Sequence, residues 1–111
     1  MGYLFHFRPG LNTIAEFLRE CVIPRVKGKD ATAVEAIWRD LWNFTMTYGR
    51  GGVAAMAMSA LDIALWDAIG KRANLPLHRL WGHVRKELPV YGSGCFRGSG
   101  GDGMIAKALH Y

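Results

Sequence analysis

The stretch from Gly52 to Ala73 constrains this 111-residue sequence more than any other feature. As an α-helix it would have almost no polar face, because apolar residues occupy nearly all sides of it: Val53, Met56, Ala57, Ala60, Leu61, Ile63, Ala64, Leu65 and Ala68. Such a helix is stable only where other elements surround it. We therefore predict a central helix over 52–73, which Asn74 ends in a left-handed turn and Pro76 prevents from extending.

A first helix is predicted before this central one, over roughly residues 11–22. Thr13 and Glu16 have the spacing of a capping box, in which each side chain bonds the backbone N–H of the other residue. Apolar residues then recur at helical spacing until Pro24, which lacks the N–H that a helix interior requires. We expect the helix to end before this proline.

A second helix is predicted between Thr32 and Gly49. Thr32 and Glu35 form another capping-box pattern, and Gly49 is a typical terminator. Between them runs one wide apolar stripe of Val34, Ile37, Trp38, Leu41, Trp42 and Thr45. The helix should therefore pack by its tryptophan-bearing face.

Short strands are predicted near both ends of the chain. Residues 2–7 place Tyr3, Phe5 and Phe7 on one side at a period of two, and residues 87–91 form a similar short extended pattern. A short turn over 77–81 and a last helix from 102 to 111 complete the prediction. The fold class is therefore α+β, and mostly helical within this chain.

Charge and cysteine usage exclude several classes of protein. The net charge is +5, but the basic residues are scattered singly or in pairs, which disfavours a nucleic-acid interface. The sequence has no run of roughly 18 uncharged apolar residues, so no membrane span is predicted, and its first residues do not resemble a signal peptide. Cys21 and Cys95 lie far apart without a C-x-x-C motif, so we expect free thiols in a cytoplasmic protein.

The segment GSGGDG at 98–103 has the G-x-G-x-x-G spacing of a dinucleotide loop. In a dinucleotide fold these glycines follow the first strand directly, whereas residues 93–97 intervene here. The carboxylate expected about 20 residues later is also absent from the sequence. We interpret the segment as a strand-to-helix connection and not as a nucleotide site.

The central segment resembles a long family signature. The run AMSALDIALWDAIGK at 57–71, followed by LPLHRLWG at 75–82, is similar to that of the mandelate racemase and muconate lactonizing branch of the enolase superfamily. The segments YGRGG at 48–52, LPVY at 88–91 and GYLF at 2–5 resemble the same family. Trp81 departs from the pattern, which usually has Leu or Phe there.

The resemblance implies an incomplete two-domain architecture. Family members combine a capping domain, made of a three-stranded meander and a helical bundle, with a (β/α)₈ barrel. Residues 1–86 would be a partial capping domain that begins at the last meander strand. Residues 87–111 would be the start of the barrel, whose first strand lies at 90–92, and a complete barrel needs about 250 residues.

Two groups of residues become candidates for binding substrate through this resemblance. Ser93 follows the first barrel strand, where relatives place a hydroxyl on the substrate carboxylate, and Arg97 is able to pair an acid group bidentately. The alternative is that Ser93 only caps a turn. The other group matches the capping-domain loop that selects the substrate: Phe5, His6, Phe7 and Arg8.

The residues of this second group differ in what they suggest. Alternating aromatics such as Phe5 and Phe7 more often belong to a core than to a pocket. Arg8, beside Pro9, is harder to bury and is the better candidate. A cation with an imidazole, as in Arg8 and His6, suits a polyhydroxylated acid better than an aromatic one.

The resemblance also implies the activity. Family members abstract the proton next to a carboxylate and stabilise the enolate with Mg²⁺. We expect a sugar acid dehydratase that is homo-oligomeric when complete. A racemase or epimerase is the alternative within the family, and a small basic helical binding module is the alternative from another class. The family's metal ligands and bases lie on later barrel strands, so we expect this chain alone to hold no catalytic residue, bind no Mg²⁺ and be inactive.

Other polar residues receive structural interpretations. Asp62 and Asp67 lie on different faces of the central helix, so they are not a catalytic pair. We expect Asp62 to accept hydrogen bonds from a neighbouring loop and Asp67 to pair with Lys71. His78 and His83 have no acidic partner nearby in the sequence and are predicted to lie on the surface.

Overall fold

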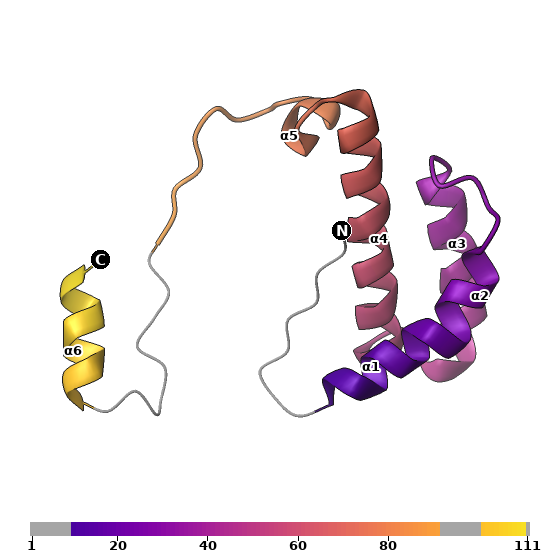
Figure 1. Cartoon of the computed structure of the whole chain (residues 1–111), viewed down its shortest axis with the longest axis horizontal. Helices are drawn as coiled ribbons and strands as arrows, with labels where there is room; N and C mark the ends of the chain where they lie inside the picture. Colours follow the sequence, from indigo (N-terminus) through magenta and orange to yellow (C-terminus); the bar gives the residue numbers. More distant parts are fainter. Residues whose placement is uncertain (1–9, 92–100, 111) are drawn as a thin grey trace.

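The computed structural model describes residues 10–91 and 101–110, which form helices and turns with no strand among them. The α-helices are α1 (Leu11–Phe17), α2 (Ile23–Val26), α3 (Val34–Phe44), α4 (Gly52–Ala73), α5 (Leu77–Leu80) and α6 (Gly101–His110). A π-helix, η1 (Leu18–Val22), joins α1 to α2, and a 3₁₀-helix, η2 (Thr45–Tyr48), follows α3. Figure 1 shows α1, α2 and α3 grouped beside α4, with α6 set apart. The predicted, mostly helical character of the chain is confirmed for the described residues.

The first helical segment continues past Pro24, contrary to the prediction. The π-helix η1 immediately precedes α2, and Pro24 occupies the first turn of α2. A proline is tolerated in a first turn, because its missing N–H would have no partner there. The π turn, which is wider than an α turn, shifts the pattern of backbone hydrogen bonds just before Pro24. The chain therefore remains helical to Val26.

Neither predicted capping box forms. Gly10 precedes α1 and Ala33 precedes α3, and neither helix start has a side-chain cap. Thr13 lies inside α1, while the Thr32 backbone N–H and hydroxyl both donate to the Asp30 carboxylate, at 2.9 and 2.8 Å. These bonds, that of the backbone N–H first, lower the pKa of Asp30. Thr32 therefore bonds within the turn that begins at Asp30 and does not cap α3.

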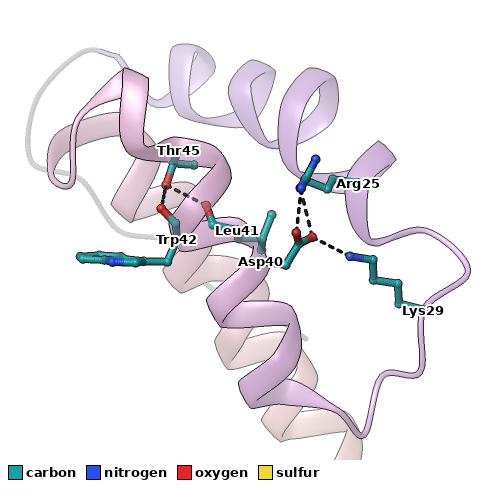
Figure 2. Close-up of polar contacts among 6 residues, drawn as sticks. All are labelled: Arg25, Lys29, Asp40, Leu41, Trp42 and Thr45. Carbon is teal, nitrogen blue, oxygen red and sulfur yellow. Dashed lines mark hydrogen bonds and ion pairs between the residues drawn. The ribbon is translucent and has the colours of Figure 1, made fainter.

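The core lies where α1, η1 and α3 meet α4. Its members are apolar and nearly inaccessible to water: Ile14, Val22, Ile37, Leu41, Ala57 and Met58. Leu41 projects from α3 and is 1% exposed. The buried hydroxyl of Thr45 donates to the Leu41 carbonyl at 2.8 Å, so it leaves no unsatisfied polar group beside the core (Figure 2).

α4 contacts η1, α1, α3 and α5, yet much of its surface stays uncovered. Its fully buried residues are Ala54, Ala57, Met58 and Gly70. By length and composition α4 is able to cross a membrane, and 17% of its most apolar window is buried. Core helices pass the same test, and the contacts of α4 with α1 and α3 are those of a core helix. The predicted central position of α4 therefore holds, with only part of its cover present in the described residues.

The overall dimensions agree with incomplete cover. The Cα radius of gyration is 18.1 Å, whereas a compact chain of this length would have about 13 Å. The accessible surface is 8896 Å², against about 6,100 Å² for a compact monomer of this mass. The chain therefore exposes far more surface than a closed domain of its size.

The end of α4 follows the prediction. Asn74 adopts the left-handed conformation at φ 51°, and the Leu75 N–H donates to the Gly70 carbonyl at 3.0 Å. Gly70 is needed at this point, because a Cβ there would lie 3.1 Å from the Leu75 carbonyl oxygen and from the Leu77 side chain. The turn folds α5 back onto the end of α4.

Asp40 ties α2 and the turn that follows it to α3. Its carboxylate accepts two hydrogen bonds from Arg25, at 2.7 and 3.0 Å, and one from Lys29 at 2.6 Å (Figure 2). These contacts, that of Arg25 foremost, hold the pKa of the Asp40 carboxyl below its ordinary value. The paired geometry fixes the direction in which α2 leaves toward α3.

Asp40→Asn is expected to lower the free energy of unfolding by about 1 kcal/mol at neutral pH, because these partly exposed pairs are lost. A carboxyl with a lowered folded-state pKa contributes its full stabilisation above its unfolded pKa. The difference from wild type should therefore shrink as the pH falls below about 4, and vanish once the pH is below the lowered pKa of Asp40 in the folded state. Urea titrations across this pH range measure it. Asp102→Asn on α6 is the control, and a loss that is equal for both variants would contradict the account.

The strand predicted at 87–91 does not form. These residues carry neither helix nor strand hydrogen bonding, and Val90 and Tyr91 are 90% and 88% exposed. A strand is stable only when its backbone pairs with a neighbour, and the described residues offer none. The strand predicted at 2–7 lies outside the described residues, as does residue 92, the last residue of the predicted first barrel strand.

Candidate functional site

The predicted substrate-binding residues lie outside the part of the chain that the structure describes. They are Phe5, His6, Phe7, Arg8, Ser93 and Arg97. Cys95 and the beginning of the glycine segment are outside it as well, whereas Cys21 is a free, partly buried thiol. The substrate-binding roles therefore remain predictions from the sequence.

The described residues form a different candidate site, a hollow between α3 and α4. Glu35 and Trp38 come from α3, and Asp62 and Trp66 come from α4. Together they line an open depression of about 240 Å³. The spacings explain why these side chains converge, because residues three or four positions apart share one face of a helix. We call this feature the α3–α4 hollow.

Each helix contributes one indole ring to the lining of the hollow, and each of these rings contacts a second indole. Trp38 stacks on Trp42 with 6.4 Å between ring centroids, and Trp66 meets Trp81 edge-on at 5.3 Å. The guanidinium of Arg50 lies over the Trp42 ring, 4.5 Å from its centroid. The four tryptophans of the chain therefore form two pairs, and one member of each pair lines the hollow, a composition typical of binding surfaces.

The electrostatics of the hollow are unfavourable. The pKa of the Asp62 carboxyl is raised, mainly because burial removes water from it and secondly because Glu35 repels its charge. The expected hydrogen bonds from a neighbouring loop are not formed by residues 10–91 or 101–110, so that prediction is wrong for this part of the chain. Asp62 is left as a partly buried carboxylate beside a second carboxylate.

Sequence reasoning missed this site because it assigned each residue separately. Glu35 was expected in a capping box, Trp38 in the packing stripe and Asp62 in a loop contact. The sequence does contain a sign of the site: an acidic residue and a tryptophan lie three positions apart in α3, and another such pair lies four positions apart in α4. Which helix faces meet depends on tertiary packing and is not visible in the spacing.

A second depression, of about 410 Å³, lies at the end of α4 and is lined by residues between Asp67 and Leu77. The predicted pair of Asp67 and Lys71 is confirmed, with Nζ and Oδ2 2.6 Å apart. The hydrogen bond from Lys71 is the largest cause of the lowered pKa of Asp67. This depression is open to solvent. Its two charged residues, Asp67 and Lys71, pair with each other, and this i,i+4 pair stabilises the end of α4.

The described side chains do not form a metal site. They include no group of three His, Cys, Asp or Glu residues placed to hold a metal ion. His78 and His83 are exposed, as predicted, with their rings 4.9 Å apart. Two imidazoles without a third ligand do not provide a Mg²⁺ site, since magnesium prefers oxygen ligands.

Known proteins resemble this chain strongly. The family model for the N-terminal domain of mandelate racemase and muconate lactonizing enzyme matches residues 1–82. A 3,6-anhydro-α-L-galactonate cycloisomerase of Streptomyces coelicolor is 40% identical over 98 residues, 85% of this chain and 26% of that protein. A D-mannonate dehydratase of Caulobacter vibrioides is 38% identical over 101 residues, 89% of this chain and 24% of that protein.

A further relative is a putative L-rhamnonate dehydratase of Caldivirga maquilingensis, 44% identical over 70 residues, 62% of this chain and 18% of that protein. No solved structure matches the chain. The chain spans about a quarter of the length of the first two relatives. The match to the family model covers most of the chain and agrees with the helical fold. The chain therefore belongs to the mandelate racemase and muconate lactonizing enzyme family of the enolase superfamily, and carries its N-terminal domain.

Proposed function

We propose that this chain supplies the N-terminal capping part of an enzyme that dehydrates a sugar acid. The observation that carries the proposal is its similarity, at 38% and 44% identity, to a D-mannonate dehydratase and a putative L-rhamnonate dehydratase. The cycloisomerase relative favours an isomerase as the second candidate. Both candidates act on a sugar acid, so the substrate class is the same and only the outcome differs.

The role we assign to this chain is recognition of the substrate. Arg8 and His6 would hold the carboxylate or hydroxyl groups, Phe5 and Phe7 would exclude water, and Ser93 and Arg97 would contact the acid group from the barrel side. Mg²⁺, when bound, would stabilise negative charge on the substrate carboxylate. We place its ligands in the remainder of the enzyme, because no group of described side chains fits a metal. We further propose that the complete enzyme is cytoplasmic and homo-oligomeric, and binds neither nucleic acid nor membrane.

A chimera tests this proposal. The corresponding N-terminal segment of the Caulobacter vibrioides D-mannonate dehydratase is replaced by this chain, and dehydration is assayed over a panel of sugar acids with and without Mg²⁺. We expect metal-dependent dehydration with a changed order of preference, and no turnover by the 111-residue chain alone. Turnover by the isolated chain, or a folded chimera that is inactive on every sugar acid, would contradict the proposal.

The assigned contact is tested in the same chimera. Arg8→Ala should raise KM by about tenfold or more, because a charge-assisted hydrogen bond to the substrate is lost. Arg79→Ala, on the exposed surface of α5, is the matched control and should leave KM unchanged. Equal KM values for the two variants would remove Arg8 from the site while leaving the family assignment untouched.

A further inference from the structure

The α3–α4 hollow has the chemistry of a receptor for an organic cation. Two carboxylates, of Glu35 and Asp62, and two indole rings, of Trp38 and Trp66, line the same depression of about 240 Å³. Indole faces attract cations through the ring quadrupole, and carboxylates attract them directly. The combination selects a flat or compact positive group over a neutral or negative one.

No cation of the described residues fills this place. No Lys or Arg in residues 10–91 forms an ion pair with Glu35 or Asp62, although the chain carries a net charge of +5. Of the neighbouring cations, Arg50 lies over Trp42 and Arg25 binds Asp40. Arg39 lines the adjacent depression with Glu35 and Trp38, and it forms no ion pair with either carboxylate of the hollow. Glu35 and Asp62 therefore repel each other without compensation, which an added positive charge would relieve.

The same chain shows which cation suits such a surface. Arg25 pairs bidentately with the Asp40 carboxylate and also lies 4.7 Å from the centroid of the Phe44 ring. A guanidinium is able to do both at once, because it is planar, carries a fork of N–H donors and stacks on aromatic faces. An ammonium group offers the charge without the stacking plane.

The position of the hollow indicates where the cation comes from. α4 is apolar nearly all round and incompletely covered, and the chain spans about a quarter of the length of its relatives. The remaining polypeptide is thus large enough to cover the exposed side of α3 and α4. We propose that the α3–α4 hollow receives an arginine side chain of the remainder of the enzyme, which sits between the indoles of Trp38 and Trp66 and bonds the carboxylates of Glu35 and Asp62. The inference rests on the proposed function, in which this chain is one part of a larger enzyme.

The test uses N-acetylargininamide as the probe and N-acetylcitrullinamide as its uncharged isostere. Both are titrated into the 111-residue chain at concentrations where light scattering detects no association. The readout is the chemical shift of the indole N–H groups. We expect the arginine probe to bind with a dissociation constant in roughly the millimolar range and to shift Trp38 and Trp66. Equal binding of the citrulline probe would overturn the proposal.

Variants locate the binding site. Asp62→Asn and Glu35→Gln should each weaken binding of the arginine probe by about tenfold, because each removes one charge-assisted contact. Glu20→Gln, an exposed carboxylate on η1, is the matched control and should have no effect. Circular dichroism confirms that each variant keeps its helices. Unchanged affinity in Asp62→Asn would also overturn the proposal.

Two further outcomes separate this inference from its alternatives. In the first outcome, the isolated chain self-associates and Asp62→Asn alone abolishes the association. The occupant of the hollow is then a basic side chain of a second copy, and the assignment to the rest of the enzyme is overturned. The readouts involve no turnover. An inactive chimera with intact binding of the arginine probe would therefore reject the proposed function, whereas an active chimera without probe binding would reject only this inference.

Discussion

Leu41→Ala is expected to lower the free energy of unfolding by about 2–5 kcal/mol, a large share of the stability of a chain this size. Leu41 is 1% exposed and packs in the core with Ile14, Val22 and Met58. Shortening it removes buried methyl groups from the contact between α3 and α4 and leaves a cavity that rigid helices fill poorly. Urea denaturation followed by circular dichroism measures the loss.

The control for this prediction is another leucine that lies in a helix but outside the core. Leu109 on α6 is 84% exposed, so Leu109→Ala should change the midpoint of unfolding only slightly. The comparison cancels the helix propensity of leucine and alanine. Similar losses for the two variants would show that the described core does not hold the helices together.

The sequence was sufficient to predict the long helix and its end. The apolar pattern marks both ends of α4, and Asn74 with Pro76 marks its stop, because these signals are local in the chain. The path through Pro24 was not predictable in this way. Whether proline ends a helix or is accommodated by a π turn depends on the tertiary contacts of Val22, which is completely buried.

Tertiary effects also explain the other differences. Thr13 and Thr32 carry the residue types of a cap, but the backbone enters each helix at a different residue. The strand predicted at 87–91 requires a partner strand, and pairing is a property of the neighbour as much as of the segment. The α3–α4 hollow arises from two helix faces that meet, which no spacing within one helix reveals.

The second large effect concerns the uncovered surface of α4. Val53 and Ile63 are 36% and 43% exposed, and much of the helix between them is only partly covered. Exposed apolar surface of this extent favours association, because burial of such surface against any partner is favourable. We therefore expect the isolated chain to self-associate and to bind hydrophobic dyes.

Substitution tests whether α4 causes the association. Ile63→Lys places a charge on the uncovered face and should shift the chain toward the monomer. Val84→Lys is the matched control, since Val84 is 90% exposed but lies after α5. A reduction that is equal for both variants would mean that net charge, and not the face of α4, controls the association.

The apolar, incompletely covered surface of α4 is the feature from which we infer that further polypeptide covers this helix in the enzyme. Size-exclusion chromatography with light scattering on the isolated chain, over a range of concentrations, tests it most directly. We expect species larger than the 12.3 kDa monomer, and we expect their size to grow with concentration. A compact monomer at every concentration, melting in one cooperative transition, would contradict it.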